Sequence, residues 1–166
     1  MRMFLSTLVF VSASATAALA DPARTTAQVQ TLFTALEQGD MGVVSSMMAD
    51  DVVKTVAYAA SGDTTPESQR IFDGKAAVMG YFEGARQLIP QVAFVDTDIT
   101  VSAGGETVFV QNRGDMVLAD GRAYSNLYVW RVDFEGGQIV EMTEYFNPVT
   151  AALAFGRPLG PDNAGE

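Results

Sequence analysis

Two carboxylates and one arginine are the residues whose types and spacing could do chemistry. On the last predicted strand Glu144 shares a face with apolar residues, where a carboxylate is costly unless it is protonated, hydrogen-bonded or paired with a cation. Arg113 and Asp115 lie two positions apart on an earlier strand and point the same way, about 7 Å apart. If that face is inward, Arg113 lies between Asp115 and Glu144, so one carboxylate stays ionised while the other takes a proton. General acid–base catalysis requires such an arrangement.

Two other interpretations of these three residues remain open. An arginine flanked by carboxylates is often a structural ion pair that does no chemistry. A shift of one residue in the strand assignment would also turn Arg113 and Asp115 to the opposite face of the sheet. The sequence therefore offers Arg113, Asp115 and Glu144 as catalytic candidates together with two interpretations in which they are not catalytic.

A second group of side chains lies on one face of the third predicted strand: Tyr124, Asn126, Tyr128 and Trp130. Aromatic bodies with polar tips suit a pocket wall or a dimer interface, and an ordinary sheet surface explains them equally well. The other candidate ligand-binding residues are aromatic side chains expected around the same hollow, namely Phe33, Tyr58, Tyr81, Phe82 and Phe146.

The composition excludes several classes of site. The chain has 166 residues, with ten Lys plus Arg, twenty Asp plus Glu, and neither His nor Cys. A Ser-His-Asp triad, a cysteine nucleophile, a histidine-ligated zinc and a disulfide framework are therefore absent. The formal charge of −10 argues against nucleic acid as a partner and disfavours anionic ligands. The segment Asp96-Thr97-Asp98 lacks further ligands, so we expect a solvated edge, no metal and no cofactor.

The first twenty residues have the pattern of an export signal. Arg2 supplies a positive end, residues 4–11 an apolar stretch, and Ala18-Leu19-Ala20 a small-x-small cleavage site. The apolar stretch is about half of the ~20 residues needed to cross a bilayer, so we expect no membrane anchor in the mature protein. We predict a periplasmic or secreted protein cleaved after Ala20. The alternative is a buried N-terminal helix.

The elements that must position these residues follow from hydrophobic periodicity. Apolar residues at i, i+3, i+4 and i+7 from Val29 to Leu36 predict an amphipathic helix that ends at Gly39. The next predicted elements are a short helix capped by Asp40, a β-rich segment over 52–58, a loop over 59–69 and a helix that opens at 73–75 and ends at Pro90.

The second half of the chain changes to a period of two. It predicts strands over 91–102, 106–118, 123–134 and 138–146, joined by glycine-containing hairpin turns, and a closing helix from Asn147 to about Phe155. Helices followed by strands indicate an α+β domain over 21–155, with a cone-shaped curved antiparallel sheet wrapped around the N-terminal helices. The Gly/Pro-rich tail over 156–166 is predicted to be disordered.

Three segments carry a resemblance to a known superfamily: Gly121–Trp130, Glu135–Ile139 and Thr143–Asn147. The sequence resembles the SnoaL-like branch of the nuclear transport factor two and ketosteroid isomerase superfamily. The resemblance implies a cone-shaped α+β barrel, usually dimeric, around a hydrophobic cavity. The superfamily includes isomerases, cyclases, dehydratases, epoxide hydrolases and non-catalytic modules, so the fold does not define the activity.

Within the superfamily, limonene-type epoxide hydrolases are similar at the three candidate catalytic residues. Their Arg-x-Asp resembles Arg113-Gly114-Asp115, and their second Asp before a Tyr-Phe pair aligns with Glu144. By this resemblance Glu144 would activate water, Asp115 would protonate the epoxide oxygen, and Arg113 would bridge them. The chain departs from the pattern because Glu replaces Asp and because residues 52–56 lack the Tyr-x-Asn of the family.

The sequence thus predicts an exported, homodimeric domain that binds a small apolar molecule in a cone cavity, with cofactor-independent acid–base activity of the hydrolase or isomerase type. The alternative is a non-catalytic ligand-binding or dimerisation module of the same fold.

Overall fold

Four α-helices and seven strands make up the part of the chain that the computed structural model describes, which is residues 21–59, 63 and 65–159. The predicted export signal over 1–20 and the last seven residues of the predicted tail lie outside the described residues. In order, the elements are α1 (Pro22–Gln38), α2 (Met41–Ser46), β1 (Met48–Val56), a short 3-10 helix (Pro66–Ser68), β2 (Arg70–Asp73), α3 (Lys75–Leu88), β3 (Gln91–Val101), β4 (Thr107–Val117), β5 (Ala123–Tyr124), β6 (Leu127–Glu135), β7 (Gln138–Phe146) and α4 (Pro148–Phe155).

Helices α1 and α2 form where their caps and apolar positions predict them. The Asp21 carboxylate accepts a hydrogen bond from the Ala23 amide, Pro22 occupies the first turn, and Gly39 ends α1 in the left-handed region at φ 72°. Asp40 then caps α2 by accepting from the Val43 amide. The predicted apolar face of α1 is buried, so the helix lies against the sheet on that face.

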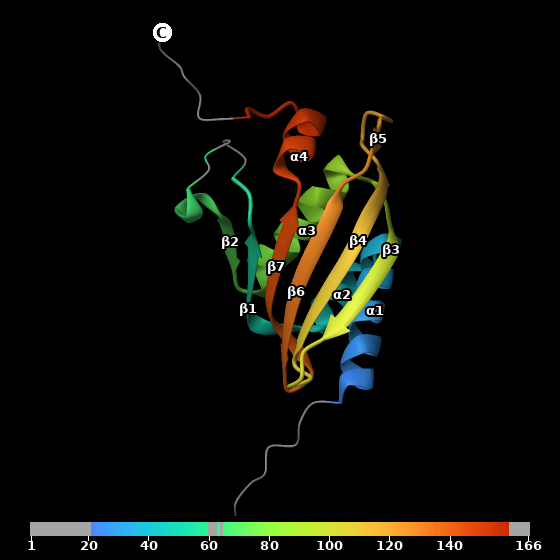
Figure 1. The fold of residues 1–166 in the computed structure, drawn as a ribbon, viewed down its shortest axis with the longest axis vertical. Coiled ribbons are helices and arrows are strands. Elements are labelled where there is room, and N and C mark those ends of the chain that lie inside the picture. Colours follow the sequence, from blue (N-terminus) through green and yellow to red (C-terminus); the bar gives the residue numbers. More distant parts are fainter. Residues whose placement is uncertain (1–20, 60–62, 64, 160–166) are drawn as a thin grey trace, which may run out of the picture.

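The sheet has the strand order β2-β1-β7-β6-β4-β3, with β5 paired to β4 (Figure 1). All these pairs are antiparallel except β1 and β7, which run parallel. The expected antiparallel sheet is therefore a mixed one. The reason is that β7 returns beside β1 only after β2, α3 and the strands β3 to β6. Two strands that pair in parallel require a long connection of this kind.

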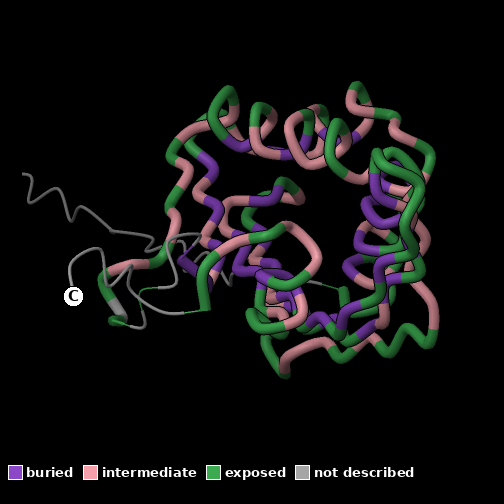
Figure 2. The backbone as a smooth tube through the Cα atoms, turned by 90° about the horizontal axis from the view of Figure 1, so that it is seen from above, coloured by how far each residue is buried: buried purple, intermediate pink, exposed green. Residues whose placement is uncertain are grey.

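Irregularities in the strand pairing bend the sheet. One extra residue stands between Val95 and Asp98 of β3, and within that bulge Asp96 has a φ of 55°. Further register shifts occur between Met48 and Val53 and between β6 and β7. Bulges increase local twist and bend a strand, so the sheet curves around the helices and the buried positions of both layers face the interior (Figure 2).

The strand predicted over 123–134 is divided into β5 and β6 in the structure. Strand β2 was not predicted, because its four residues are too few to show a period of two. No helix among the described residues is long and apolar enough to span a membrane.

Helix α4 depends on its N-cap, since the Asn147 side-chain oxygen accepts hydrogen bonds from the amides of Val149 and Thr150. Replacement Asn147→Ala should lower the free energy of unfolding by about 1 kcal/mol, measured by urea denaturation. Asn147→Asp keeps the oxygen and should stay close to the wild type; equal losses in both variants would contradict a capping role.

Candidate functional site

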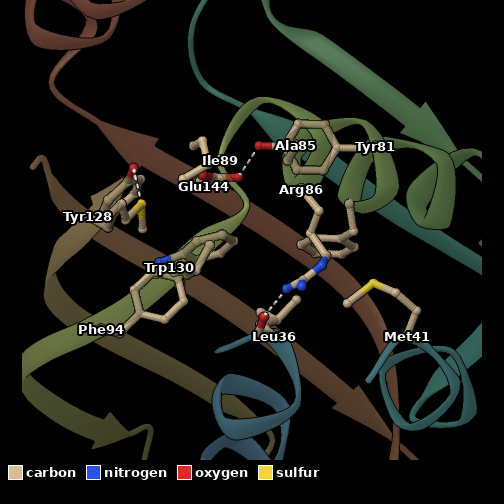
Figure 3. Close-up of a pocket in the computed structure, with 13 residues that line it drawn as sticks. Leu36, Met41, Tyr81, Ala85, Arg86, Ile89, Phe94, Tyr128, Trp130 and Glu144 are labelled. Atoms are coloured by element: carbon tan, nitrogen blue, oxygen red, sulfur yellow. Dashed lines mark hydrogen bonds between the residues drawn. The ribbon is translucent and has the colours of Figure 1, made fainter. Parts of the chain in front are cut away.

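A buried glutamate on β7 is the centre of the candidate site. Glu144 is 5% exposed and points to the interior, as its alternation with apolar residues predicts. Its Oε2 atom lies 2.8 Å from Nζ of Lys54, a fully buried residue of β1, the parallel neighbour of β7. The hydroxyl of Tyr81 on α3 donates to the same oxygen at 2.7 Å (Figure 3). The carboxylate therefore has the cation and the hydrogen bond that its burial requires.

Three aromatic rings surround the Lys54 ammonium. It lies 4.6 Å from the ring centroid of Trp130, 4.7 Å from that of Tyr81 and 5.2 Å from that of Phe82. Burial lowers the pKa of Lys54, although the negative charge of Glu144 opposes this effect. Cation–π contacts supply part of the stabilisation that the ammonium loses on leaving water.

Tyr81 is held in its protonated form. Burial, and then the charge of Glu144, raise the pKa of the Tyr81 hydroxyl well above its usual range. Burial likewise raises the pKa of Tyr128, whose hydroxyl lies 3.3 Å from that of Tyr124. Near neutral pH Tyr81 is thus a hydrogen-bond donor that fixes the Glu144 carboxylate in one orientation.

Both side-chain hydrogen bonds of Glu144 use Oε2, and among the described residues Oε1 accepts no hydrogen bond. Glu144 lines two adjoining cavities of about 90 and 430 Å³. The two cavities share five lining residues, namely Tyr81, Ala85, Ile89, Tyr128 and Glu144. The arrangement leaves one carboxylate oxygen to meet a bound molecule in a mostly apolar hollow.

Small residues on α3 keep the larger cavity open. Ala77, Gly80 and Gly84 are on its wall, and a Cβ added at either glycine would meet no atom within 4 Å. Glycine inside a helix costs about 1 kcal/mol relative to alanine. Gly80 and Gly84 both lower the stability of α3 in this way, and their lack of side chains leaves the free volume of the cavity beside Glu144.

Arg113 and Asp115 do not belong to the site, contrary to the expectation that they face inward. The buried positions of β4 alternate along the strand, so Arg113 and Asp115 lie on the outer face; they are Val108, Val110, Asn112, Gly114 and Met116. The Arg113 side chain is 43% exposed and forms its ion pair with Asp96, at 3.0 Å. The predicted Arg113–Asp115–Glu144 cluster is therefore wrong, and with it the epoxide hydrolase arrangement.

The physical reason for this error is that β4 carries apolar side chains on both faces. Phe109, on the face of Arg113, is 41% exposed, whereas the smaller Val108 and Val110 are fully buried. Alternation sorts residues into two faces but does not say which face is inward when both are apolar.

Most of the candidate ligand-binding residues line the two cavities. Tyr81 and Tyr128 line both, Phe82 and Trp130 line the smaller one, and Tyr124 and Phe146 line the larger one.

The other three lie elsewhere. Phe33 packs in the core against Phe94 and Trp130, with ring centroids 5.1 and 5.6 Å away. Asn126 donates to the Tyr124 hydroxyl and to the Asn147 carbonyl, so it ties β6 to the start of α4. Tyr58 lines a separate cavity beside α4.

Sequence reasoning missed Lys54. Its signal was the alternation of Val52, Lys54 and Val56 on a β-rich segment, which places a lysine on a face that is otherwise apolar. The expectation that Glu144 pairs with a cation is correct, but the cation is Lys54 and not Arg113. Among the described residues no three acidic side chains are grouped in a way that could hold a metal ion.

Loss of Lys54 should destabilise the fold, because Glu144 would remain buried without its cation. We expect Lys54→Met to lower the free energy of unfolding by about 3–5 kcal/mol and Lys54→Met with Glu144→Gln to recover much of it, measured by urea denaturation. Lys75→Met, which removes an exposed ion pair with Asp50, is the matched control and should have a much smaller effect. Equal effects at Lys54 and Lys75 would contradict the central role of the buried pair.

The raised pKa of Tyr81 predicts a pH dependence. The unfolded chain releases this proton near pH 10, whereas the folded chain retains it, so the contribution of Tyr81 to stability is complete below that pH and is lost as the pH rises above it. In the folded protein the tyrosinate absorbance that develops up to pH 10.5 should be the same in Tyr81→Phe and wild type. A smaller signal in the variant would show that Tyr81 ionises normally.

Comparisons with known proteins agree with the fold. A family model described as a SnoaL-like domain matches residues 29–142. The uncharacterized protein YesE of Bacillus subtilis (strain 168) is 27% identical over 118 residues, which cover 70% of this chain and 77% of that protein.

Two solved structures show the fold. A protein of Bacillus subtilis proposed as an isomerase has a TM-score of 0.68 and 22% identity, covering 81% of this chain and 94% of that one. A proposed polyketide cyclase of Xanthomonas campestris pv. campestris has a TM-score of 0.60 and 22% identity, covering 76% and 92%. The family model matches more than half of the sequence, and the chain therefore belongs to the family of SnoaL-like domains.

Proposed function

We propose that this protein binds a small, largely apolar molecule in its cone cavity and moves a proton on that molecule with Glu144, without a cofactor. The observation that carries the proposal is the state of the Glu144 carboxylate. Oε2 is fixed by Lys54 and Tyr81, while Oε1 has no partner among the described residues and the side chain lines both cavities.

The size and chemistry of the hollow support binding of a small molecule. The larger cavity, at about 430 Å³, lies within the range of about 300–1,000 Å³ that small-molecule sites occupy. Its walls carry aromatic side chains, among them Phe72, Tyr128 and Phe146. Such walls bind an apolar body by burial and ring contacts.

Proton transfer at a carbon atom suits this site better than epoxide hydrolysis. The hydrolysis would require Arg113 and Asp115 beside Glu144, and both residues are on the outer face of the sheet. A fixed carboxylate in an apolar hollow can take a proton from a carbon next to a carbonyl group and return it to another atom of the same molecule, as an isomerase or a cyclase does. The names of the two structural neighbours are consistent with that class of reaction.

Binding without chemistry is the second candidate. The contacts at Oε2 favour it, because an ammonium and a hydroxyl within 3 Å give the buried carboxylate a structural role that needs no reaction.

Export and assembly stay predictions. The pattern of residues 1–20 supports export to the periplasm or the medium. The outer face of the sheet carries exposed apolar side chains, including Phe109, Leu127, Val129 and Tyr145, which support a second copy of the chain as the partner on that face.

An exchange experiment tests the role of Glu144. The probe is 2-tetralone, an apolar bicyclic ketone, in D₂O, and the loss of its α-proton signal is followed by NMR. We expect a saturable, protein-dependent exchange that falls at least ~100-fold in Glu144→Gln. Arg131→Gln, on the outer face, is the control and should retain the wild-type rate.

Two further measurements make the result unambiguous. Gly84→Leu, which fills the larger cavity from a position where a Cβ meets nothing, should also abolish exchange while Glu144 is kept. Circular dichroism and thermal unfolding establish that each variant is folded. Unchanged exchange in Glu144→Gln would refute the base; binding of 2-tetralone to the wild type without exchange would favour the second candidate.

A further inference from the structure

Two arginines in the wall of the larger cavity have no carboxylate partner among the described residues. Of the ten Lys and Arg, Arg2 precedes the described residues, and five of the remaining nine form ion pairs with carboxylates. The four that do not are Arg24, Arg70, Arg86 and Arg157. Arg70 and Arg157 line the larger cavity and Arg86 lines the smaller one, so three of the four converge on the candidate site.

Arg70 and Arg157 reach this cavity from elements that are far apart in the sequence. Arg70 begins β2, and its guanidinium lies over the rings of Phe72 and Tyr81, 5.2 and 5.8 Å from their centroids. Arg157 follows α4 and lies over Phe155 at 5.3 Å. Both side chains are half-buried. A guanidinium stacked on a ring keeps its in-plane N–H groups for a planar anion, with which it forms two parallel hydrogen bonds.

The charge inside this cavity opposes the charge of the whole chain. The chain carries −10 formally, yet the single carboxylate among the described lining residues belongs to Glu144, which Lys54 neutralises. Arg70 and Arg157 therefore leave the wall positively charged. A half-buried guanidinium without a counter-charge is costly, and an anion bound between aromatic walls removes that cost.

We infer that the molecule bound in this cavity is an apolar acid, a ring-sized body carrying one carboxylate that Arg70 and Arg157 hold. This inference rests on the proposed binding function and names its ligand class. It also places the anchor close to the base, because Arg70 lies over the ring of Tyr81 and the Tyr81 hydroxyl is bonded to Glu144. The anionic ligands that the acidic composition disfavours are thus accepted at one site whose local charge is reversed.

The test uses a matched pair of probes, 2-naphthoate and its neutral analogue 2-naphthamide, titrated calorimetrically into the full mature protein at pH 7. We expect the wild type to bind the acid at least about 10-fold more tightly than the amide. Arg70→Gln and Arg157→Gln should each weaken the acid by about 10-fold and change the amide less than about 2-fold. Arg131→Gln, which removes a paired arginine from the outer face, should change neither.

Three outcomes separate this inference from the proposed function. Equal affinity for the two probes, or an equal loss for both in the arginine variants, overturns the carboxylate site while cavity binding stands. Loss of both probes in Gly84→Leu, with selective loss of the acid in the arginine variants, supports both proposals. Failure of the wild type to bind either probe overturns both. Thermal unfolding of each variant shows that it is folded, and Arg157→Gln alone decides if Arg70→Gln does not fold.

Discussion

The fold and the candidate site share one constraint, which is the buried ion pair between Lys54 and Glu144. Either charge alone would be too costly inside the sheet, so β1 and β7 must be neighbours and Tyr81 must face them from α3. The pairing uses one oxygen of the carboxylate and leaves the other for the cavity. Structural and chemical roles therefore meet in a single side chain, and a change that improves one has consequences for the other.

The aromatic rings around the pair add a second layer to this arrangement. Trp130 is the cross-strand neighbour of Glu144, and Phe82 and Tyr81 come from successive positions of α3. They exclude water from the ammonium and at the same time form the wall against which an apolar ligand would lie. The low dielectric that makes the pair costly to build also strengthens any hydrogen bond that a ligand makes to Glu144.

Local signals in the sequence predicted the helices, most strands and the inward position of Glu144. Residues that cap helices, such as Asp40 and Asn147, act within a few positions of themselves, and so they can be found without knowing the fold. Alternation also indicated that the buried Glu144 must be protonated, hydrogen-bonded or paired with a cation.

The identity of the cation could not be predicted in this way. Lys54 and Glu144 are 90 positions apart in the sequence and meet because β1 and β7 pair in parallel, and hydrophobic periodicity does not indicate which strands pair. The same limit explains the other failures. The inward position considered for Arg113 was wrong because β4 carries apolar side chains on both faces. Arg70 was not identified because β2 has only four residues, too few to show a period of two. The role of a residue that depends on the order of the strands can be predicted only when the sheet topology is known.

Gly80 and Gly84 have a consequence for how such a domain can diversify. They set the free volume of the hollow from two positions of α3 that have no side-chain bond to the ionic cluster, which the helix contacts through Tyr81, so side-chain size at these two positions can change while the reactive carboxylate and its partners stay as they are. The size of the accepted ligand and the reactivity of the carboxylate can therefore change independently in evolution. Substitutions at Gly80 and Gly84 alter the ligand that fits and leave the reacting group unchanged.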